Sequence, residues 1–292
     1  MKKKRAVFLL VFFHLLILAK TGQAKIAFSL KASAGYGKIF GGDLNMVLAS
    51  HDGFYGDLAD RLGMSKKGRF EKMSGAPGGK VALMVDLSDK FGIGVGVGYV
   101  QSRKESQANL SLDPLYQGEA KIDGKIQAWP IELSAYYKHP ISEKWELVIE
   151  GGLVYCLGTL SYSMSLDEKF WTTSMKSQTQ GAADDRGLGF HGAVGLFFSV
   201  AGGIDIFIEG AGRYARLNHW EGEENYSDTE KIYERRLGFL WYYEFYDNEA
   251  QATYSNLILS PEKPAGPNIK NARLFDNSLS EISLRVGLRA RI

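Results

Sequence analysis

The last thirteen residues of the chain carry a strand pattern that strongly limits the fold. Every second residue there is apolar, namely Ile282, Leu284, Val286, Leu288, Ala290 and Ile292. The residues between them include Arg285, Arg289 and Arg291. A period of two predicts a β-strand with one apolar face and one cationic face. Because an unpaired buried charge is costly, these arginines need water or ionic partners. The segment is therefore predicted to separate an apolar environment from a polar one.

The first 24 residues have the pattern of a secretory signal peptide. A charged start, Lys2 to Arg5, precedes an apolar stretch from Ala6 to Ala19. The small residues that follow predict cleavage between Ala24 and Lys25. An uncleaved N-terminal anchor is the alternative, although the stretch is short for a membrane helix. The predicted division is a signal peptide over residues 1–24 and one mature domain over residues 25–292.

Removing that segment changes the charge of the chain. The segment carries five of the 35 basic residues and none of the 33 acidic ones, which leaves the mature chain with a net charge of −3. Nucleic acid is therefore not expected as a partner, since phosphate binding needs a basic surface. The single cysteine, Cys156, excludes an intramolecular disulfide. After residue 24 no stretch suits a membrane helix, so a membrane location requires a closed barrel.

Seven further segments alternate like the tail. They cover residues 26–36, 81–87, 91–99, 129–137, 145–155, 190–198 and 204–214. Short connections at 88–90, 139–144 and 201–203 alternate with long polar ones at 38–78, 103–124, 163–186 and 216–279. This arrangement predicts an all-β fold, an eight-stranded antiparallel transmembrane up-and-down β-barrel with long extracellular loops and periplasmic termini. A secreted β-sandwich is the alternative.

Aromatic residues recur at both ends of the apolar face in several of these strands. They are Phe28, Tyr36, Phe91, Tyr99, Trp129, Tyr137, Trp145, Tyr155, Phe190, Phe198 and Tyr214. A spacing of eight residues in a tilted strand covers about 20 Å of height, close to the apolar band of a membrane barrel. These residues are therefore predicted to form two aromatic girdles.

The opposite face of the same strands predicts a charged lumen. Its members are Lys31, Glu132, Glu150, Glu209, Arg213, Arg285 and Arg289. Most of them fall near mid-height, which favours an ion-pair network that fills the narrow interior of an eight-stranded barrel. A gated path for ions or small solutes and a catalytic constellation are the alternatives. The lone His191 and Cys156 also face inward, where both are interpreted as packed structural residues.

Two of the long connections carry patterns of their own. Residues 43–62 predict a helix with Asp43 as its N-cap and Gly63 as its stop, which either packs as part of the loop, caps the barrel mouth or lies on the membrane. The connection 216–279 runs from acidic to basic and then to aromatic residues at 239–246. The aromatic run could extend strand seven or eight as a hairpin. If exposed, it predicts a contact surface for an extracellular ligand or partner.

With these patterns the mature chain resembles the small eight-stranded outer-membrane β-barrels of the OmpA/OmpX type. The resemblance is carried by the segments 129–133, 142–145, 208–214 and 283–292. Within the last segment, Arg285, Gly287, Ala290 and Ile292 occupy the positions of a C-terminal assembly signal, which usually ends in an aromatic residue. The resemblance implies a location in the outer membrane of a diderm bacterium, with the membrane lipids and the barrel-assembly machinery as partners.

The predicted function is a non-enzymatic role in the envelope or in surface interaction. A narrow channel or small-ligand conduit is the alternative, and a lipid-modifying barrel enzyme is the third hypothesis. An enzyme would need a Ser/His/acid group near the outer leaflet, for which His219 is the weakest kind of candidate. No catalytic residue, metal ligand or cofactor is predicted.

Overall fold

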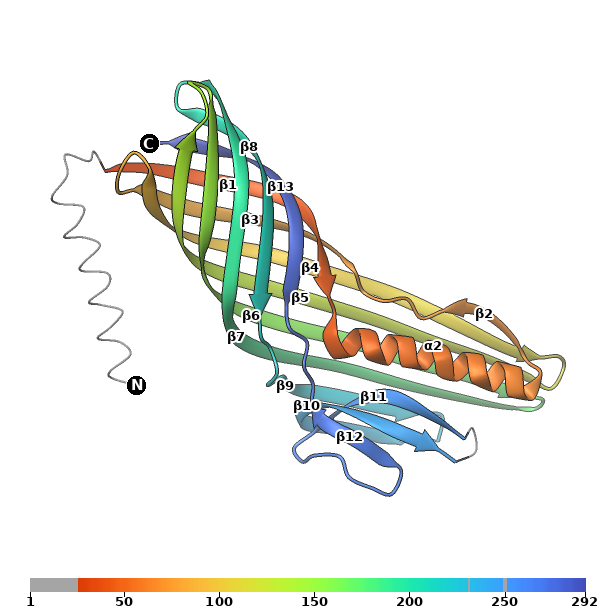
Figure 1. Ribbon diagram of the computed structural model, residues 1–292. Coiled ribbons are helices and arrows are strands. Elements are labelled where there is room, and N and C mark those ends of the chain that lie inside the picture. Colours follow the sequence, from red (N-terminus) through yellow and green to blue (C-terminus); the bar gives the residue numbers. More distant parts are fainter. Residues whose placement is uncertain (1–25, 231, 249–250) are drawn as a thin grey trace.

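The protein forms a closed eight-stranded antiparallel barrel that continues into a long extension on one side (Figure 1). The computed structural model describes residues 26–230, 232–248 and 251–292. The predicted signal peptide and its cleavage point between Ala24 and Lys25 therefore lie outside the described residues. The barrel strands are β1 (Ala27–Phe40), β3 (Gly75–Asp86), β4 (Phe91–Leu112), β5 (Tyr116–Pro140), β6 (Trp145–Phe170), β7 (Thr173–Ala201), β8 (Ile204–Ala215) and β13 (Ser280–Arg291).

The tail is the strand that closes the barrel. β13 pairs antiparallel with β1, with Ala32 opposite Leu288, and with β8, with Ile206 opposite Leu288. Its apolar face points outward, since Ile282, Leu284, Val286 and Leu288 are 54 to 64% exposed. The start of β1 and the end of β13 lie at the end of the barrel that carries the short turns (Figure 1). The predicted eight-stranded up-and-down barrel is thus confirmed.

Four strands are much longer than the alternation in the sequence indicated. β4 to β7 contain 22, 25, 26 and 29 residues. The stretches 103–124 and 163–186, predicted as long loops, are instead paired strands that turn only at residues 113–115 and 171–172. The prediction failed because the strands change character along their length. Beyond the girdles, their outward residues are polar, so the segments resemble loops in composition.

The connection 216–279 is also a sheet. It contains β9 (Glu221–Asp228), β10 (Tyr233–Asp247), β11 (Ala252–Ser260) and β12 (Ile269–Leu274), while β2 (Ser65–Arg69) pairs with β4 on the other side. β9 pairs with β7, and β10 then pairs with β9, β11 and β12. The prediction that this region extends strand seven or eight as a hairpin is therefore wrong. The additional sheet pairs instead with β7, which is the sixth strand of the barrel.

The predicted helix is α2 (Gly42–Leu62), which ends at Gly63 in the left-handed conformation. Asp43 is not its N-cap. That position is occupied by Gly41, and the Asp43 carboxylate instead accepts hydrogen bonds from Arg273 and from the amide of Asp276. The helix packs as part of the extension, between β2 and β11 (Figure 1). Among the described residues, no helix is long and apolar enough to cross a membrane.

α2 contacts β11 on one side and β2 on the other. The Ser50 hydroxyl accepts a hydrogen bond from the amide of Ser255 in β11 at 2.7 Å. On the other side, Lys66 Nζ in β2 lies 2.8 Å from the Asp52 carboxylate. The helix thereby covers polar strand edges that would otherwise be open to pairing.

The extension encloses its own apolar core, which lies above the lumen. Members of this core come from α2, from the inner faces of β4 to β7, from the segments around β10 and β11 and from the connections after β2 and before β9. The largest are Leu48, Phe70, Met73, Ile126, Leu160, Leu217, Trp220, Leu240, Tyr242, Leu259 and Phe275. Cys156 belongs to the same core and is fully buried. The described part of the chain therefore has two interiors, a polar lumen and an apolar extension core.

Candidate functional site

Every residue predicted for the aromatic girdles points outward from the barrel. Phe28, Phe91, Trp145 and Phe198 gather near the short turns, with Tyr137 facing Phe91 at a ring distance of 5.1 Å. The remaining six lie at the level where the extension begins: Tyr36, Tyr99, Trp129, Tyr155, Phe190 and Tyr214. The two levels enclose a wall of exposed Val, Leu and Ile side chains.

The upper level has the polar edge that aromatic residues show at a membrane interface. The Tyr99 ring lies 4.7 Å from that of Trp129, and its hydroxyl donates to Gln101 at 2.6 Å. Gln127 in turn donates to the Tyr99 hydroxyl at 2.5 Å. A closed barrel with an apolar wall between two aromatic levels is the exterior of a membrane-spanning barrel. The chain folds as a transmembrane β-barrel of the outer-membrane type.

The lower lumen, near the short turns, holds the first group of ion pairs. Arg289 lies 2.7 Å from Asp205 and 2.8 Å from Glu146, and its guanidinium covers the Phe197 ring at 4.4 Å. Phe197 stacks on Phe207 with ring centroids 4.6 Å apart. This stack fills the space above Arg289 with apolar atoms.

The middle of the lumen holds two lysines between three glutamates. Lys31 Nζ lies 3.0 Å from Glu150 and also contacts Glu209. Lys80 Nζ lies 2.7 Å from the other oxygen of Glu150 and 2.6 Å from Glu132. All five side chains are at least 95% buried. Because each ammonium bridges two carboxylates, no charge of this group is left alone.

Two arginines complete the network on the side of β8 and β13. Arg213 contacts Glu281 and lies 3.4 Å from Glu132. Arg285 lies 3.6 Å from Glu281 and 3.8 Å from Glu209. The middle network therefore pairs four cations with four anions, so that it is neutral as a whole. A balanced network offers no surplus charge to attract a passing ion.

All seven residues predicted for the lumen face it, and the structure brings six of them together in the middle network, while Arg289 lies in the separate lower group. Sequence reasoning missed Lys80 and Glu281 of the middle network and Glu146 and Asp205 of the lower group. It also missed a separate inward pair, in which Lys138 lies 2.8 Å from Asp86. Each shares the inward parity of a neighbouring residue that the alternation places correctly. Lys80, for example, precedes inward Ala82 by two residues. Lys80 and Lys138 lie one position outside the predicted segments, whereas the other four lie inside them and could have been found from their inward parity.

Three lumen side chains could in principle hold a metal ion. Ligand atoms of Glu132, Glu150 and His191 lie within 4.8 Å of one another. However, the Lys80 ammonium lies against both carboxylates and supplies the positive charge that a metal would bring. These residues therefore fit an ion-pair network and not a metal centre. His191 lies 3.7 Å from Glu132 and takes part in the same network.

Side chains fill the remaining width of the lumen. Gly92, Gly94, Gly96 and Gly98 face inward, and a Cβ at Gly92 would lie 2.2 Å from the Tyr136 hydroxyl. The cavity among Lys80, Glu132 and Arg285 measures about 10 Å³, which is about the volume of one water probe. Directly above it, the apolar core of the extension covers the barrel mouth.

The residues of the predicted assembly signal lie in the closing strand. Gly287 faces the lumen, where a Cβ would lie 2.6 Å from the Phe207 ring. Arg285 belongs to the ion network, while Ala290 pairs with Leu30 on the lipid side. Ile292 is 82% exposed and donates its amide to Phe28. Its role in assembly stays a prediction.

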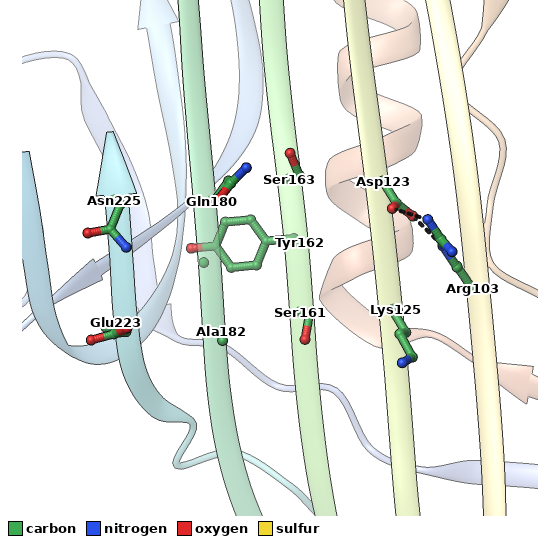
Figure 2. Close-up of a pocket in the computed structure, with 11 residues that line it drawn as sticks. Arg103, Asp123, Lys125, Ser161, Tyr162, Ser163, Gln180, Ala182, Glu223 and Asn225 are labelled. Carbon is green, nitrogen blue, oxygen red and sulfur yellow. Dashed lines mark hydrogen bonds and ion pairs between the residues drawn. The ribbon is translucent and has the colours of Figure 1, made fainter. Parts of the chain in front are cut away.

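A second candidate site lies outside the barrel, on the outward face of the extension. A groove of about 490 Å³ crosses β4, β5, β6, β7 and β9. Figure 2 shows the residues that line it. Its outward-facing lining is polar or small: Arg103, Asp123, Lys125, Ser161, Ser163, Gln180, Ala182, Glu223 and Asn225. Tyr162 and Gly181 also line it, but both are buried, and Tyr162 turns its hydroxyl towards buried Glu224. Arg103 makes a two-pronged ion pair with Asp123, with nitrogen–oxygen distances of 2.7 and 3.1 Å. This hydrogen bonding raises the pKa of Arg103, which stays charged.

Comparisons with known proteins find likeness only among solved structures. No protein-family model and no curated protein matches the chain. The chain is similar to the outer membrane protein OprG from Pseudomonas aeruginosa, at 12% identity with 92% of this chain and 98% of that chain covered, and a TM-score of 0.35. A major outer membrane protein from Thermus thermophilus is 12% identical, with 92% and 100% covered and a TM-score of 0.38. The outer membrane protease OmpT from Escherichia coli is 10% identical, with 91% and 95% covered and a TM-score of 0.24.

These three proteins are all from outer membranes, and their likeness to this chain is too low to support an argument about activity. The assignment of the fold rests on the strand pairing and on the apolar wall of this chain itself.

Proposed function

We propose that this protein is a non-enzymatic and non-conducting barrel of the bacterial outer membrane, which holds a rigid β-sheet extension outside the cell for a structural or surface-interaction role. This proposal rests on the observation that two separate layers of side chains close the lumen. A charge-balanced network fills the barrel at mid-height, and the apolar core of the extension lies above it.

Both layers oppose the passage of ions or polar solutes. An ion that crosses the network has to displace pairs such as Lys80 and Glu132, whose side chains are at most 4% exposed. It then meets fully buried Trp220 and Leu160 at the barrel mouth. Transfer of a charge into such apolar surroundings costs many kcal/mol. The filled interior therefore supports a scaffold in preference to a conduit.

The outward direction of the extension supports the surface role. From Leu157, at the upper aromatic level, β6 continues for thirteen residues to Phe170, which is about 40 Å along the strand. Between these two residues the outward positions, from Thr159 to Lys169, are polar, unlike the lipid-facing wall below them. An extension of this length presents a large surface to the medium.

Conductance measurements in planar bilayers test the proposal. The folded mature chain is expected to give no stepwise current, and its shift on SDS gels between unboiled and boiled samples verifies that the barrel is intact. A variant with Trp220→Ala and Leu217→Ala opens the apolar cover but keeps the ion network, and it is also expected to stay silent. Regular conductance steps from the wild-type chain would overturn the non-conducting role in favour of the channel hypothesis.

A further inference from the structure

The outward groove of the extension has the chemistry of a ligand site. Two rows of side chains cross it, because residues opposite each other in the ladders share one face. The lower row consists of Arg103, Lys125, Ser161, Ala182 and Glu223. The upper row contains Asp123, Ser163, Gln180 and Asn225. The serines and Ala182 form a low floor, and the longer side chains form the walls (Figure 2).

Several polar groups of the groove have no partner within the described residues. Arg103 is paired with Asp123, and Glu223 is paired with Arg235 at 2.6 Å. By contrast, the described part of the chain supplies no side-chain hydrogen bond or ion pair to Lys125, Ser161, Ser163 or Gln180. The groove therefore presents one free ammonium, two hydroxyls and one amide to whatever occupies it.

This lining excludes several classes of ligand. The largest apolar group on the floor is the methyl of Ala182, since Tyr162 turns its hydroxyl inward to Glu224 at 2.5 Å. An apolar ligand would therefore gain little by binding. A peptide would not add as a strand, because the groove lies on a sheet face and not at an edge. A polyhydroxylated ligand suits it, since hydroxyl groups both donate to and accept from such side chains.

The charge and the position of the groove further restrict the class of ligand that it suits. With the two ion pairs neutral, Lys125 leaves a surplus of one positive charge, which favours a ligand with an acidic group. Lys125 also lies on the same strand face as Trp129 of the upper girdle, four residues further from the membrane. In a tilted strand this corresponds to about 10 Å of height. The groove thus continues the lipid-facing wall of β5 and β6 into the headgroup region.

We propose that this groove binds the acidic saccharide headgroup of a glycolipid in the outer leaflet. The acyl chains lie on the wall around Trp129 and Leu157, and the carboxylate or phosphate of the sugar pairs with Lys125. Sugar hydroxyls bond to Ser161, Ser163 and Gln180. This inference rests on the proposed location in the outer membrane, and it assigns a partner to the surface role.

Binding to the full mature chain in phosphatidylcholine nanodiscs tests the proposal. The probes are bacterial lipopolysaccharide mixed into the nanodisc, the acidic oligosaccharide freed from that lipid, and neutral maltohexaose. Lipopolysaccharide is expected to stay bound in native mass spectrometry, and the free acidic oligosaccharide to bind more weakly. Maltohexaose is expected not to bind. Equal affinity for the free sugar and the lipid would overturn the glycolipid assignment, and equal affinity for maltohexaose would overturn the acidic one.

Two variants and one control locate the site. Lys125→Gln is expected to weaken binding at least tenfold, because it removes a charged hydrogen bond. Ala182→Phe fills the floor and is expected to abolish binding. Lys121→Gln changes another partly exposed lysine of β5 that is already paired with Glu119, and binding should stay within twofold. Unchanged binding in both groove variants, or no lipopolysaccharide on the wild-type chain, would overturn the proposal.

The failure of this inference is distinguishable from that of the proposed function. Gel mobility before and after boiling, together with conductance, is measured on the same preparation. A silent, intact barrel that does not bind the glycolipid would leave the scaffold role standing and remove only the partner.

Discussion

The membrane half of the barrel and the extension are built from the same strands, but their two faces have opposite polarity. In β5 the outward residues from Trp129 to Tyr137 are apolar, and the inward ones include Glu132 and Lys138. Further along the same strand, outward residues such as Lys125 are polar, while inward Ile126 is buried in the extension core. The alternation of inward and outward residues continues along the strand without a bulge. The surroundings therefore decide which face is apolar.

The change occurs at one level on four neighbouring strands. The last large apolar outward residues are Tyr99 in β4, Trp129 in β5, Leu157 in β6 and Leu188 in β7. Lipid surrounds the wall below this level, and water surrounds it above. Two kinds of interior follow, one held by ion pairs and one by apolar packing.

The largest effect is expected for an ion pair of the lumen. Arg213→Ala removes the partner of Glu281 and of Glu132 inside the barrel. Breaking a buried pair on one side typically costs about 3–5 kcal/mol. The unboiled, compact band on SDS gels should therefore disappear at a clearly lower temperature or urea concentration.

The matched control for Arg213→Ala is an ion pair of the extension surface. Arg103→Ala breaks a similar pair whose arginine side chain is 57% exposed. It should change stability by less than about 1 kcal/mol. Equal losses in the two variants would contradict the difference between the two regions.

A cavity in the extension core should have the next largest effect. Leu160→Ala removes a fully buried side chain, with an expected cost of about 3 kcal/mol. Three residues away, outward Leu157→Ala should cost far less in detergent, since Leu157 is 41% exposed. Limited proteolysis reports the opening of the extension, and gel mobility reports the barrel. Proteolysis that does not distinguish the two variants would count against an independently packed extension core.

Acid should weaken the packing of α2 within the extension. His51 in α2 packs between Phe70 and Tyr254, and burial lowers its pKa from 6.5 to about 4. The unfolded chain therefore binds a proton at a higher pH than the folded chain does, so stability falls as pH decreases from about 6.5 towards 4. Between pH 8 and pH 5 the expected loss is about 2 kcal/mol.

Protease resistance of the extension, measured as a function of pH, follows this loss. A His51→Leu variant should not show this part of the pH dependence. If the two proteins lose protection in parallel, His51 is not the group responsible.

The smallest effects are expected at two glycines of the same helix. Gly63→Ala places a side chain at a φ of 62° and should destabilise the extension by about 1 kcal/mol. Gly53→Ala lies within the helix with open space around its Cβ and should stabilise it by up to about 1 kcal/mol. Proteolysis of the extension measures both. If both substitutions change the protease resistance in the same direction, the stability of α2 does not control the opening of the extension.

The membrane half could be predicted well because lipid imposes a strict pattern. Every outward position between the girdles must be apolar, so eight segments stood out and their faces followed from parity. Together with the seven other segments, the tail placed Arg285 and Arg289 inside the barrel. The pairing partners of those arginines were only partly predictable, because Lys80 and Glu281 lie where the apolar alternation fades.

The extension escaped prediction for a physical reason. Its inward residues are often small, as at Ala108, Ala120 and Ala183, and its outward residues are polar. Such strands have weak alternation and the composition of a loop. Pairing over long distances in sequence, as between β7 and β9, also leaves no local signal. The helix 43–62 was visible because its apolar stripe and its terminal Gly63 are local.

The long hairpins connect the tip of the extension rigidly to the barrel. β5 pairs with β6, and β6 with β7, through 25 and 26 consecutive residue pairs without a register shift at the membrane level. A pull on the turn at Trp171 therefore acts along the strands as shear, against many hydrogen bonds at once. No hinge separates the tip from the barrel in these hairpins, so a tilt of the barrel in its membrane displaces the tip sideways in proportion to the length of the arm.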